Sequence, residues 1–200
     1  MSSTGSGRRR LDPDDLRGSP TAVVRPARPT DVDGLLAFDM TVVVRTRDDW
    51  AAAIDKALRG ERVLLVAEVD GVIAAFGQAH HLDVHAVDRA PAGWFLTGVT
   101  VLPRHRRSGL AHRLTTARID WIAERSDAAW YFANGRNTAS IRLHEPLGFA
   151  EVSRAPSIHG VAFEGGEGVL FRRELHAAGR LTGGSVGAVT QPPVGATKGG

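Results

Sequence analysis

The chain has 200 residues, of which 42% are hydrophobic and 24% are charged, values that are ordinary for a globular protein. It contains no cysteine, which excludes disulfides, thiolate metal sites and a cysteine nucleophile. The formal net charge of +3 comes from the two ends of the chain, because residues 21–175 hold nineteen basic and nineteen acidic residues. A neutral central region argues against a nucleic-acid-binding domain, and no apolar run is long enough to span a membrane. We therefore expect a cytoplasmic protein with no nucleic-acid or membrane partner.

Composition divides the chain into three parts. Residues 1–20 are rich in Ser, Gly, Arg, Asp and Pro, and residues 176–200 are mostly Gly, Thr, Ala and Pro with few residues that could form a core. Segments of this kind bury too little apolar surface to fold alone. We predict a disordered N-terminal arm at 1–20, one domain at 21–175 and a disordered Gly-rich tail at 176–200.

Within the central region, apolar runs bounded by Gly, Pro and Asp alternate with segments of helical periodicity. The expected strands cover 21–25, 62–69, 72–80, 94–101, 128–133, 149–155 and 168–175. The expected helices cover 31–40, 50–59, 109–125 and 138–145. Thr30 is the expected N-cap of the first helix, and Asp48 or Asp49 that of the second. The order β-α-α-β-β-β-α-β-α-β-β predicts an α+β fold in which helices flank a mixed sheet.

The segment from Val99 to His112 combines a strand, an arginine-rich turn and a helix. The apolar run stops at Pro103, and the helix begins after Gly109. The first N–H groups of a helix have no intrahelical partner and the helix dipole adds partial positive charge, so such a turn suits a phosphate or pyrophosphate. A P-loop is excluded because the only lysines, Lys56 and Lys198, lie elsewhere, and a dinucleotide fingerprint needs more glycines. A solvated basic turn is the simpler interpretation.

Two motifs give a family resemblance. Arg106-Arg107-Ser108-Gly109-Leu110-Ala111 fits the pattern Gln/Arg-x-x-Gly-x-Gly/Ala, and residues 137–149 fit Asn-x-x-Ala/Ser-x-x-Leu-Tyr-x-x-x-Gly-Phe with His144 in place of the tyrosine. In both motifs the chain resembles the GNAT superfamily of N-acyltransferases, over roughly residues 21–175. The resemblance implies a three-layer α/β/α fold whose central sheet is mostly antiparallel and splayed where acyl-CoA binds.

The resemblance also implies which residues bind acetyl-CoA, the expected co-substrate. The backbone of Val99, Thr100 and Val101 would pair with the pantetheine arm as an added strand does. The turn and the first helical residues would hold the pyrophosphate, through backbone amides and the Arg106 side chain: Arg106, Arg107, Ser108, Gly109, Leu110, Ala111 and His112. Asn137 would contact the cofactor. Each group also has a simpler interpretation, as a buried strand, a solvated turn or a helix N-cap.

His144 stands where the family usually has a tyrosine that is proposed to protonate the departing CoA thiolate. A thiol has a pKa of about 8.5 and histidine titrates at about 6.5, so an imidazolium could donate that proton. A histidine without a catalytic part and a thiolate that leaves without help are the alternatives. For the general base, Glu68, Glu145, Glu164 and Glu167 are available. We choose Glu167, in a loop expected to border the cleft, although it could equally be a solvated loop charge.

We therefore interpret the chain as an N-acetyltransferase. It would transfer an acetyl group from acetyl-CoA to a primary amine of a small molecule or a protein, by direct attack within a ternary complex. No residue pattern indicates a metal site, and a homodimer is possible. Two other functions stay open: a non-catalytic acyl-CoA-binding regulator, which the missing tyrosine favours, and a nucleic-acid-binding protein that uses the basic turn.

Overall fold

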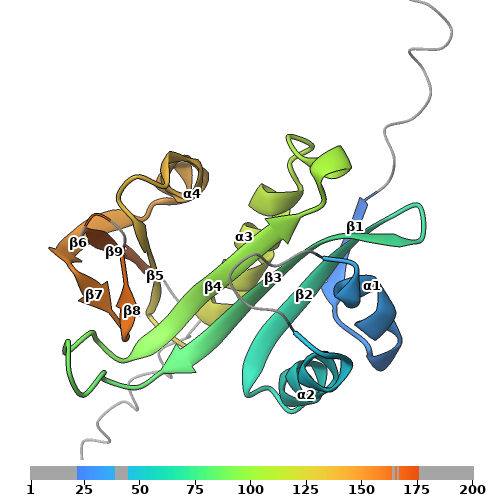
Figure 1. Ribbon diagram of the computed structural model, residues 1–200, viewed down its shortest axis with the longest axis horizontal. Helices are drawn as coiled ribbons and strands as arrows, with labels where there is room; N and C mark the ends of the chain where they lie inside the picture. Colours follow the sequence, from blue (N-terminus) through green and yellow to red (C-terminus); the bar gives the residue numbers. More distant parts are fainter. Residues whose placement is uncertain (1–21, 39–44, 164, 166, 176–200) are drawn as a thin grey trace, which may run out of the picture.

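The computed structural model describes residues 22–38, 45–163, 165 and 167–175. A seven-stranded sheet in the order β1-β2-β3-β4-β5-β9-β6 has α1 and α2 packed on one face and α3 and α4 on the other (Figure 1). This confirms the predicted three-layer α+β arrangement. The predicted arm at 1–20, the predicted tail at 176–200 and the expected end of the first helix at Met40 lie outside the described residues.

The elements follow the predicted order. The strands of the main sheet are β1 (Ala22–Pro26), β2 (Arg62–Val69), β3 (Val72–Leu82), β4 (Gly93–Val101), β5 (Ala128–Asn134), β6 (Ala150–Ala155) and β9 (Gly168–Glu174). The helices are η2 (Pro29–Asp31), α1 (Val32–Leu36), α2 (Arg47–Leu58), η3 (Pro103–His105), α3 (Leu110–Ala123), α4 (Thr138–His144) and η4 (Glu145–Leu147). In the described ranges, none of these helices combines the length and apolarity needed to cross a membrane.

β2 is buried on both faces of the sheet, which explains why it is apolar over nearly its whole length. Val63, Leu65 and Ala67 belong to the core that includes α3, whereas Leu64 and Val66 belong to the core that includes α1 and α2. A strand between two helical layers needs apolar residues at successive positions rather than at alternate ones. The strand predicted at 62–69 is confirmed, and its continuous apolar run follows from burial on both faces.

The parallel neighbours β4 and β5 separate soon after they meet. Their register joins Trp94 to Ala129 and Phe95 to Trp130, although both strands continue well beyond these pairs. Gly98, with φ of 70°, lies where the β3–β4 register shifts, and such a bulge bends a strand. The predicted splay is therefore present, on the side of β4 that faces β5.

The predicted capping residues of the first two helices are wrong. The first helical turn has Arg28 as its N-cap instead of Thr30, and the backbone N–H of Arg28 donates to the Asp31 carboxylate at 2.7 Å. Thr46 caps α2 in place of Asp48 or Asp49. The backbone N–H of Asp49 donates to Thr46 Oγ1 at 3.2 Å, while the Asp49 carboxylate accepts from the backbone N–H of Thr46 at 2.8 Å. Asp49 is thus the second member of a capping box.

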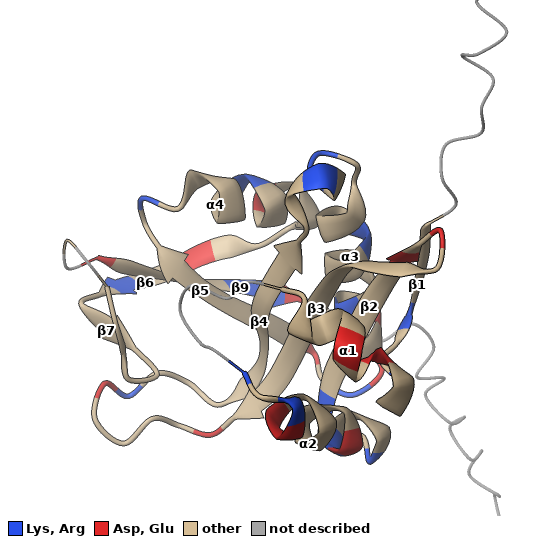
Figure 2. Ribbon diagram, turned by 45° about the vertical axis from the view of Figure 1, so that its right-hand side comes forward, with Lys and Arg blue, Asp and Glu red and all other residues tan. Residues whose placement is uncertain are grey.

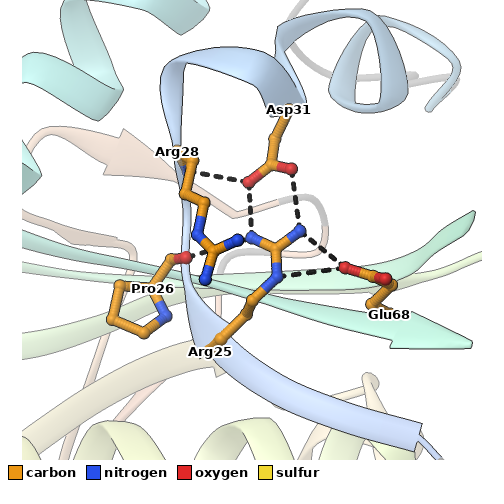
Figure 3. A network of polar contacts seen from close by, with 5 residues as sticks. All are labelled: Arg25, Pro26, Arg28, Asp31 and Glu68. Atoms are coloured by element: carbon orange, nitrogen blue, oxygen red, sulfur yellow. Dashed lines mark hydrogen bonds and ion pairs between the residues drawn. The ribbon is translucent and has the colours of Figure 1, made fainter. Parts of the chain in front are cut away.

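An arginine with two carboxylate partners ties β1 to the start of the helical layer (Figure 3). Arg25 donates to both Asp31 oxygens, at 2.7 and 2.9 Å, and to Glu68 at 2.7 and 3.0 Å. Burial alone would raise the pKa of Asp31, but hydrogen bonds from Arg25 and from the Arg28 backbone hold it below its usual value. This network, remote in sequence from the basic turn, joins β1, η2 and β2.

The sequence pattern missed a two-stranded hairpin of β7 (Ser157–Ile158) and β8 (Val161–Ala162). Asp88, in the loop between β3 and β4, accepts hydrogen bonds from the backbone N–H of Gly160 at 2.8 Å and from Ser157 Oγ at 3.1 Å. Two loops about seventy residues apart are therefore held together by one carboxylate.

Candidate active site

A cavity of about 720 Å³ lies where β4 and β5 separate. Its wall is formed by the end of β4, the basic turn, the start of α3, the second half of β5 and α4. The wall includes these residues predicted from sequence: Val99, Val101, Arg106, Arg107, Gly109, Leu110, Ala111, His112, Asn137 and His144. The structure thus brings the two motifs, about thirty residues apart in the chain, to one place.

Three predicted residues do not line this cavity. Thr100 pairs with Phe76 in the β3–β4 register, and Ser108 Oγ donates to the carbonyl of His105. Glu167 lies outside the cavity wall, half exposed, with its carboxylate 2.8 Å from Arg154 Nη1. The structure therefore does not bring the predicted general base to the predicted cofactor site.

The charged side chains of the cavity wall are arginines: Arg106, Arg107, Arg118 and Arg142. Among the described residues, no carboxylate lines the cavity and none forms an ion pair with these four arginines. The basic turn is visible as the blue segment between β4 and α3 (Figure 2). An uncompensated positive wall is suited to an anionic ligand such as the phosphates of acetyl-CoA.

The turn that leads into α3 has the geometry of an anion site. Arg107 and Gly109 both have positive φ, 62° and 81°. The first regular hydrogen bond of the helix runs from the N–H of Arg113 to Gly109 O at 3.0 Å, so the N–H groups of Leu110, Ala111 and His112 have no partner within the helix. A β-carbon at Gly109 would meet no protein atom within 4 Å. The start of α3 is therefore open to a ligand.

The end of β4 offers a free backbone edge. Beyond Phe95 it pairs only with β3 on one side, through Gly77 to Val99 and Ala75 to Val101. The side that faces β5 has no strand partner in this part of the described chain. Part of that edge is contacted from the turn, because Arg106 Nε lies 3.5 Å from Val101 O. The edge fits the expected pairing with an extended ligand.

Asn137 caps α4, as expected. Its Oδ1 accepts from the backbone N–H of Ser140 at 3.1 Å, and the residue lines the cavity. Because the cap uses the carbonyl oxygen of the side chain, the amide nitrogen is left for another partner. Capping is confirmed, and cofactor contact by Asn137 stays a prediction.

His144 is in the cavity wall but is not an exposed helix residue. It is 4% exposed, and its ring stacks on Tyr131 with centroids 4.0 Å apart. Nδ1 lies 2.8 Å from Ser140 O, and since a carbonyl only accepts, Nδ1 carries the proton. Nε2 is buried and has no hydrogen-bond partner among the described residues. The free atom of His144 therefore presents a lone pair.

The electrostatic surroundings change the chemistry expected of His144. Burial lowers the pKa of His144 to about 4, the hydrogen bond to Ser140 opposes this shift, and the positive charge of Arg118 adds to it. The ring is consequently neutral near pH 7. A neutral ring does not favour the imidazolium acid expected at this position, because the histidine is enclosed rather than solvated, and a catalytic part for His144 stays a prediction.

Arg118 is a cavity residue that sequence reasoning missed. It is 1% exposed, and its guanidinium donates to Leu114 O, Gln78 O, Gly98 O and Thr115 Oγ1. Its position four residues after Leu114 and four before Ile122 places it in the buried stripe of α3, and this spacing could have identified it. Tyr131 and Arg142 also line the cavity and were not predicted.

Comparison with known proteins agrees with this geometry. A model of the "Acetyltransferase (GNAT) family" matches residues 31–149, more than half of the chain. Aminoglycoside N(6')-acetyltransferase type 1 from Salmonella typhimurium is 34% identical over 92 residues, which are 44% of this chain and 63% of that protein. The match thus spans less than two thirds of the curated relative.

Solved structures show the same fold. A putative acetyltransferase, yncA, from Salmonella typhimurium with its cofactor acetyl-CoA has a TM-score of 0.62 at 22% identity, covering 78% of this chain and 96% of that one. The ribosomal-protein-alanine N-acetyltransferase from Brucella melitensis has a TM-score of 0.62 at 19% identity, covering 76% of this chain and 99% of that one. With the motifs, the splayed strands and the family match in agreement, the chain belongs to the acetyltransferase (GNAT) family.

Proposed function

We propose that this acetyltransferase moves an acetyl group from acetyl-CoA to a primary amine by direct attack within a ternary complex. The observation that carries this proposal is the cavity between β4 and β5, lined by four arginines and, among the described residues, by no carboxylate. A cysteinyl intermediate is impossible because the chain has no cysteine. The amine would attack the thioester while acetyl-CoA is bound.

Different parts of the cavity would hold different parts of acetyl-CoA. The free edge of Val99–Val101 would bind the pantetheine arm, and the N–H groups at the start of α3 would bind the pyrophosphate. Arg106 and Arg142, one on the turn and one on α4, would neutralise phosphate oxygens. Asn137 would donate from its free amide nitrogen. These residues bind and orient the donor.

His144 would take part in its neutral form. His144 lines a cavity in which the charged side chains, among the described residues, are arginines, and its buried Nε2 has no partner there. A neutral ring at this place would act as a hydrogen-bond acceptor rather than as an acid. Glu167 would not act as the base while its carboxylate is held by Arg154 outside the cavity wall. We propose that the amine loses its proton to water.

The decisive experiment is an acceptor screen with acetyl-CoA that measures thiol release. The names of the similar proteins give the first two acceptors, an aminoglycoside and a peptide that begins with alanine. Steady release that requires an amine supports the proposal and excludes a non-catalytic regulator. Binding of acetyl-CoA without turnover of any amine in a broad panel would instead support the regulator.

A further inference from the structure

Arg118 is the most deeply enclosed charge in the cavity wall. It projects from the middle of α3 toward the sheet and is 1% exposed. Gly77 of β3 leaves room for the guanidinium, because a β-carbon at this position would lie only 3.0 Å from Arg118 Nε. A buried guanidinium is costly unless its N–H groups are satisfied, so its place here requires explanation.

Two of the four hydrogen bonds of Arg118 are at the bulge, and the other two are within α3. Nη1 donates to Gln78 O at 2.7 Å and to Gly98 O at 3.1 Å, one carbonyl from each strand where the β3–β4 register shifts. Nη2 donates to Thr115 Oγ1 at 2.9 Å and Nε to Leu114 O at 3.2 Å. Arg118 therefore holds the bulge together, close to the point at which β4 leaves β5.

All four acceptors are neutral, so the charge of Arg118 is not compensated. Burial lowers the pKa of Arg118 to about 9, which still leaves it cationic at neutral pH. Its field reaches the atoms of the cavity, because it contributes to the lowered pKa of His144 on α4. The other titratable side chains facing the cavity are His105, Arg106, Arg107, His112, Tyr131, Arg142 and His144.

Neither aromatic side chain beside Arg118 is a good acid at neutral pH. His144 carries its proton on Nδ1, where Ser140 O holds it, and its buried Nε2 has no hydrogen-bond partner among the described residues. Burial, together with the charge of Glu145, raises the pKa of Tyr131 above its usual value, and a phenol so shifted protonates a thiolate poorly. The departing sulfur must therefore be tolerated as an anion.

We propose that Arg118 stabilises the CoA thiolate as it leaves, through its uncompensated positive charge in the cavity wall, so that transfer needs no proton donor at position 144. This inference rests on the proposed transfer from acetyl-CoA. The amine nitrogen forms the new bond to the acetyl carbon, and the C–S bond breaks with its electron pair on sulfur. The proton of the nitrogen goes to water, and the thiolate is released as an anion or takes a proton from solvent.

The test measures the thiol pKa of CoA bound to the protein, from the ultraviolet absorbance of the thiolate during a pH titration. A free thiol titrates at about 8.5, and an opposite charge close by lowers a pKa by about 1–3 units. We expect bound CoA to titrate at least about one unit below free CoA. In R118Q, which keeps hydrogen-bond donors but removes the charge, the value should return to that of free CoA.

R118K, which keeps the positive charge, should retain much of the lowering of the thiol pKa of bound CoA. R125Q is the matched control. Arg125 follows α3, stacks over Trp121 and lies outside the cavity wall, so its loss should leave the thiol pKa unchanged. Turnover in R118Q should fall while the KM for acetyl-CoA changes little, and the fall should be smaller with a thioester whose thiol is more acidic.

The outcomes separate the two proposals. If the wild-type protein does not bind CoA, the proposed function fails. If CoA binds to the wild-type protein with a thiol pKa equal to or above that of free CoA, the role of Arg118 is overturned while the proposed function stands. This outcome can be measured on the wild-type protein alone. A folded R118Q that keeps the wild-type shift would also overturn it. Should R118Q not fold, G77A offers a second variant, because its β-carbon presses on the guanidinium and should raise the thiol pKa.

Discussion

Arg25 of β1 and Arg118 of α3 have contrasting hydrogen-bond partners. Arg25 meets two carboxylates, and the hydrogen bond to Asp31 raises its pKa. Arg118 meets only carbonyl and hydroxyl oxygens, and burial lowers its pKa. Elsewhere on the side of α1 and α2, Arg47 and Arg59 also have carboxylate partners, whereas the four arginines of the cavity wall have none among the described residues.

The contrast shows how the same side chain serves two purposes. The positive charge of a paired arginine is offset by the carboxylates that it joins, and removing it leaves those carboxylates without a partner. An unpaired one costs free energy on folding and creates a positive potential that a ligand can use. The side of the sheet with α1 and α2 therefore has arginines with carboxylate partners, whereas the unpaired arginines of the gap between β4 and β5 would suit an anionic ligand.

The largest expected effect comes from placing a negative charge in the cavity. G109D should weaken acetyl-CoA binding by more than about a hundredfold, the equivalent of losing one or two hydrogen bonds to charged groups. Calorimetry provides the measurement. G71D is the matched control, because Gly71 has φ of 78° against 81° at Gly109, and both positions face open space. Equal loss of binding in both variants would show that the turn is not the phosphate site.

Next in size is the loss of the paired arginine. R25M leaves Asp31, which is 6% exposed, without its strongest partner, and should lower the free energy of unfolding by about 2–3 kcal/mol. Acetyl-CoA affinity should not change. Denaturant unfolding measures the loss, and R59M is the control, since its pairs with Asp55 and Glu61 are half exposed and should contribute under about 1 kcal/mol. A large loss of affinity in R25M would contradict the separation of the two regions.

The dependence of folding stability on pH should show that His144 is enclosed in the folded protein. Its folded pKa of about 4 lies below the unfolded value of about 6.5, so the unfolded state binds more protons between these values. Stability is therefore complete above about pH 6.5 and falls as the pH drops toward 4, by about 3 kcal/mol for this residue.

H144F removes the titrating ring and should show a shallower fall. The difference isolates His144, because His80, whose pKa burial also lowers to about 4, is present in both proteins. Denaturant unfolding at pH 7, 5.5 and 4 gives the comparison. Identical slopes in the two proteins would mean that His144 titrates normally and is exposed in solution.

The smallest effect is expected from the ends of the chain. A protein limited to residues 19–176 should melt within a few degrees of the full chain and bind acetyl-CoA equally well, since both cavity motifs and the Arg25 network lie inside these limits. Thermal unfolding and calorimetry test this prediction. A much lower melting temperature would show that one end packs on the domain.

The sequence by itself determined most of the elements and the two motifs that the structure brings together at the cavity. The apolar run of β2 has the bounds that the pattern predicted, and Asp70 and Gly71, both with positive φ, form the expected hairpin turn. The basic turn and the capping asparagine of α4 were also readable, because a turn, a cap and a helix start depend on a few consecutive residues.

Only the tertiary structure decided the electrostatics. Arg154 holds the carboxylate of Glu167 outside the cavity wall. His144 stacks on Tyr131 and contacts Ser140 O, and the charge of Arg118 helps to lower its pKa. Protonation depends on burial and on charges brought together from distant parts of the chain, which no local pattern encodes. Arg118 is an example, because its hydrogen bonds to the bulge join α3 to β3 and β4 and exist only once these elements pack together.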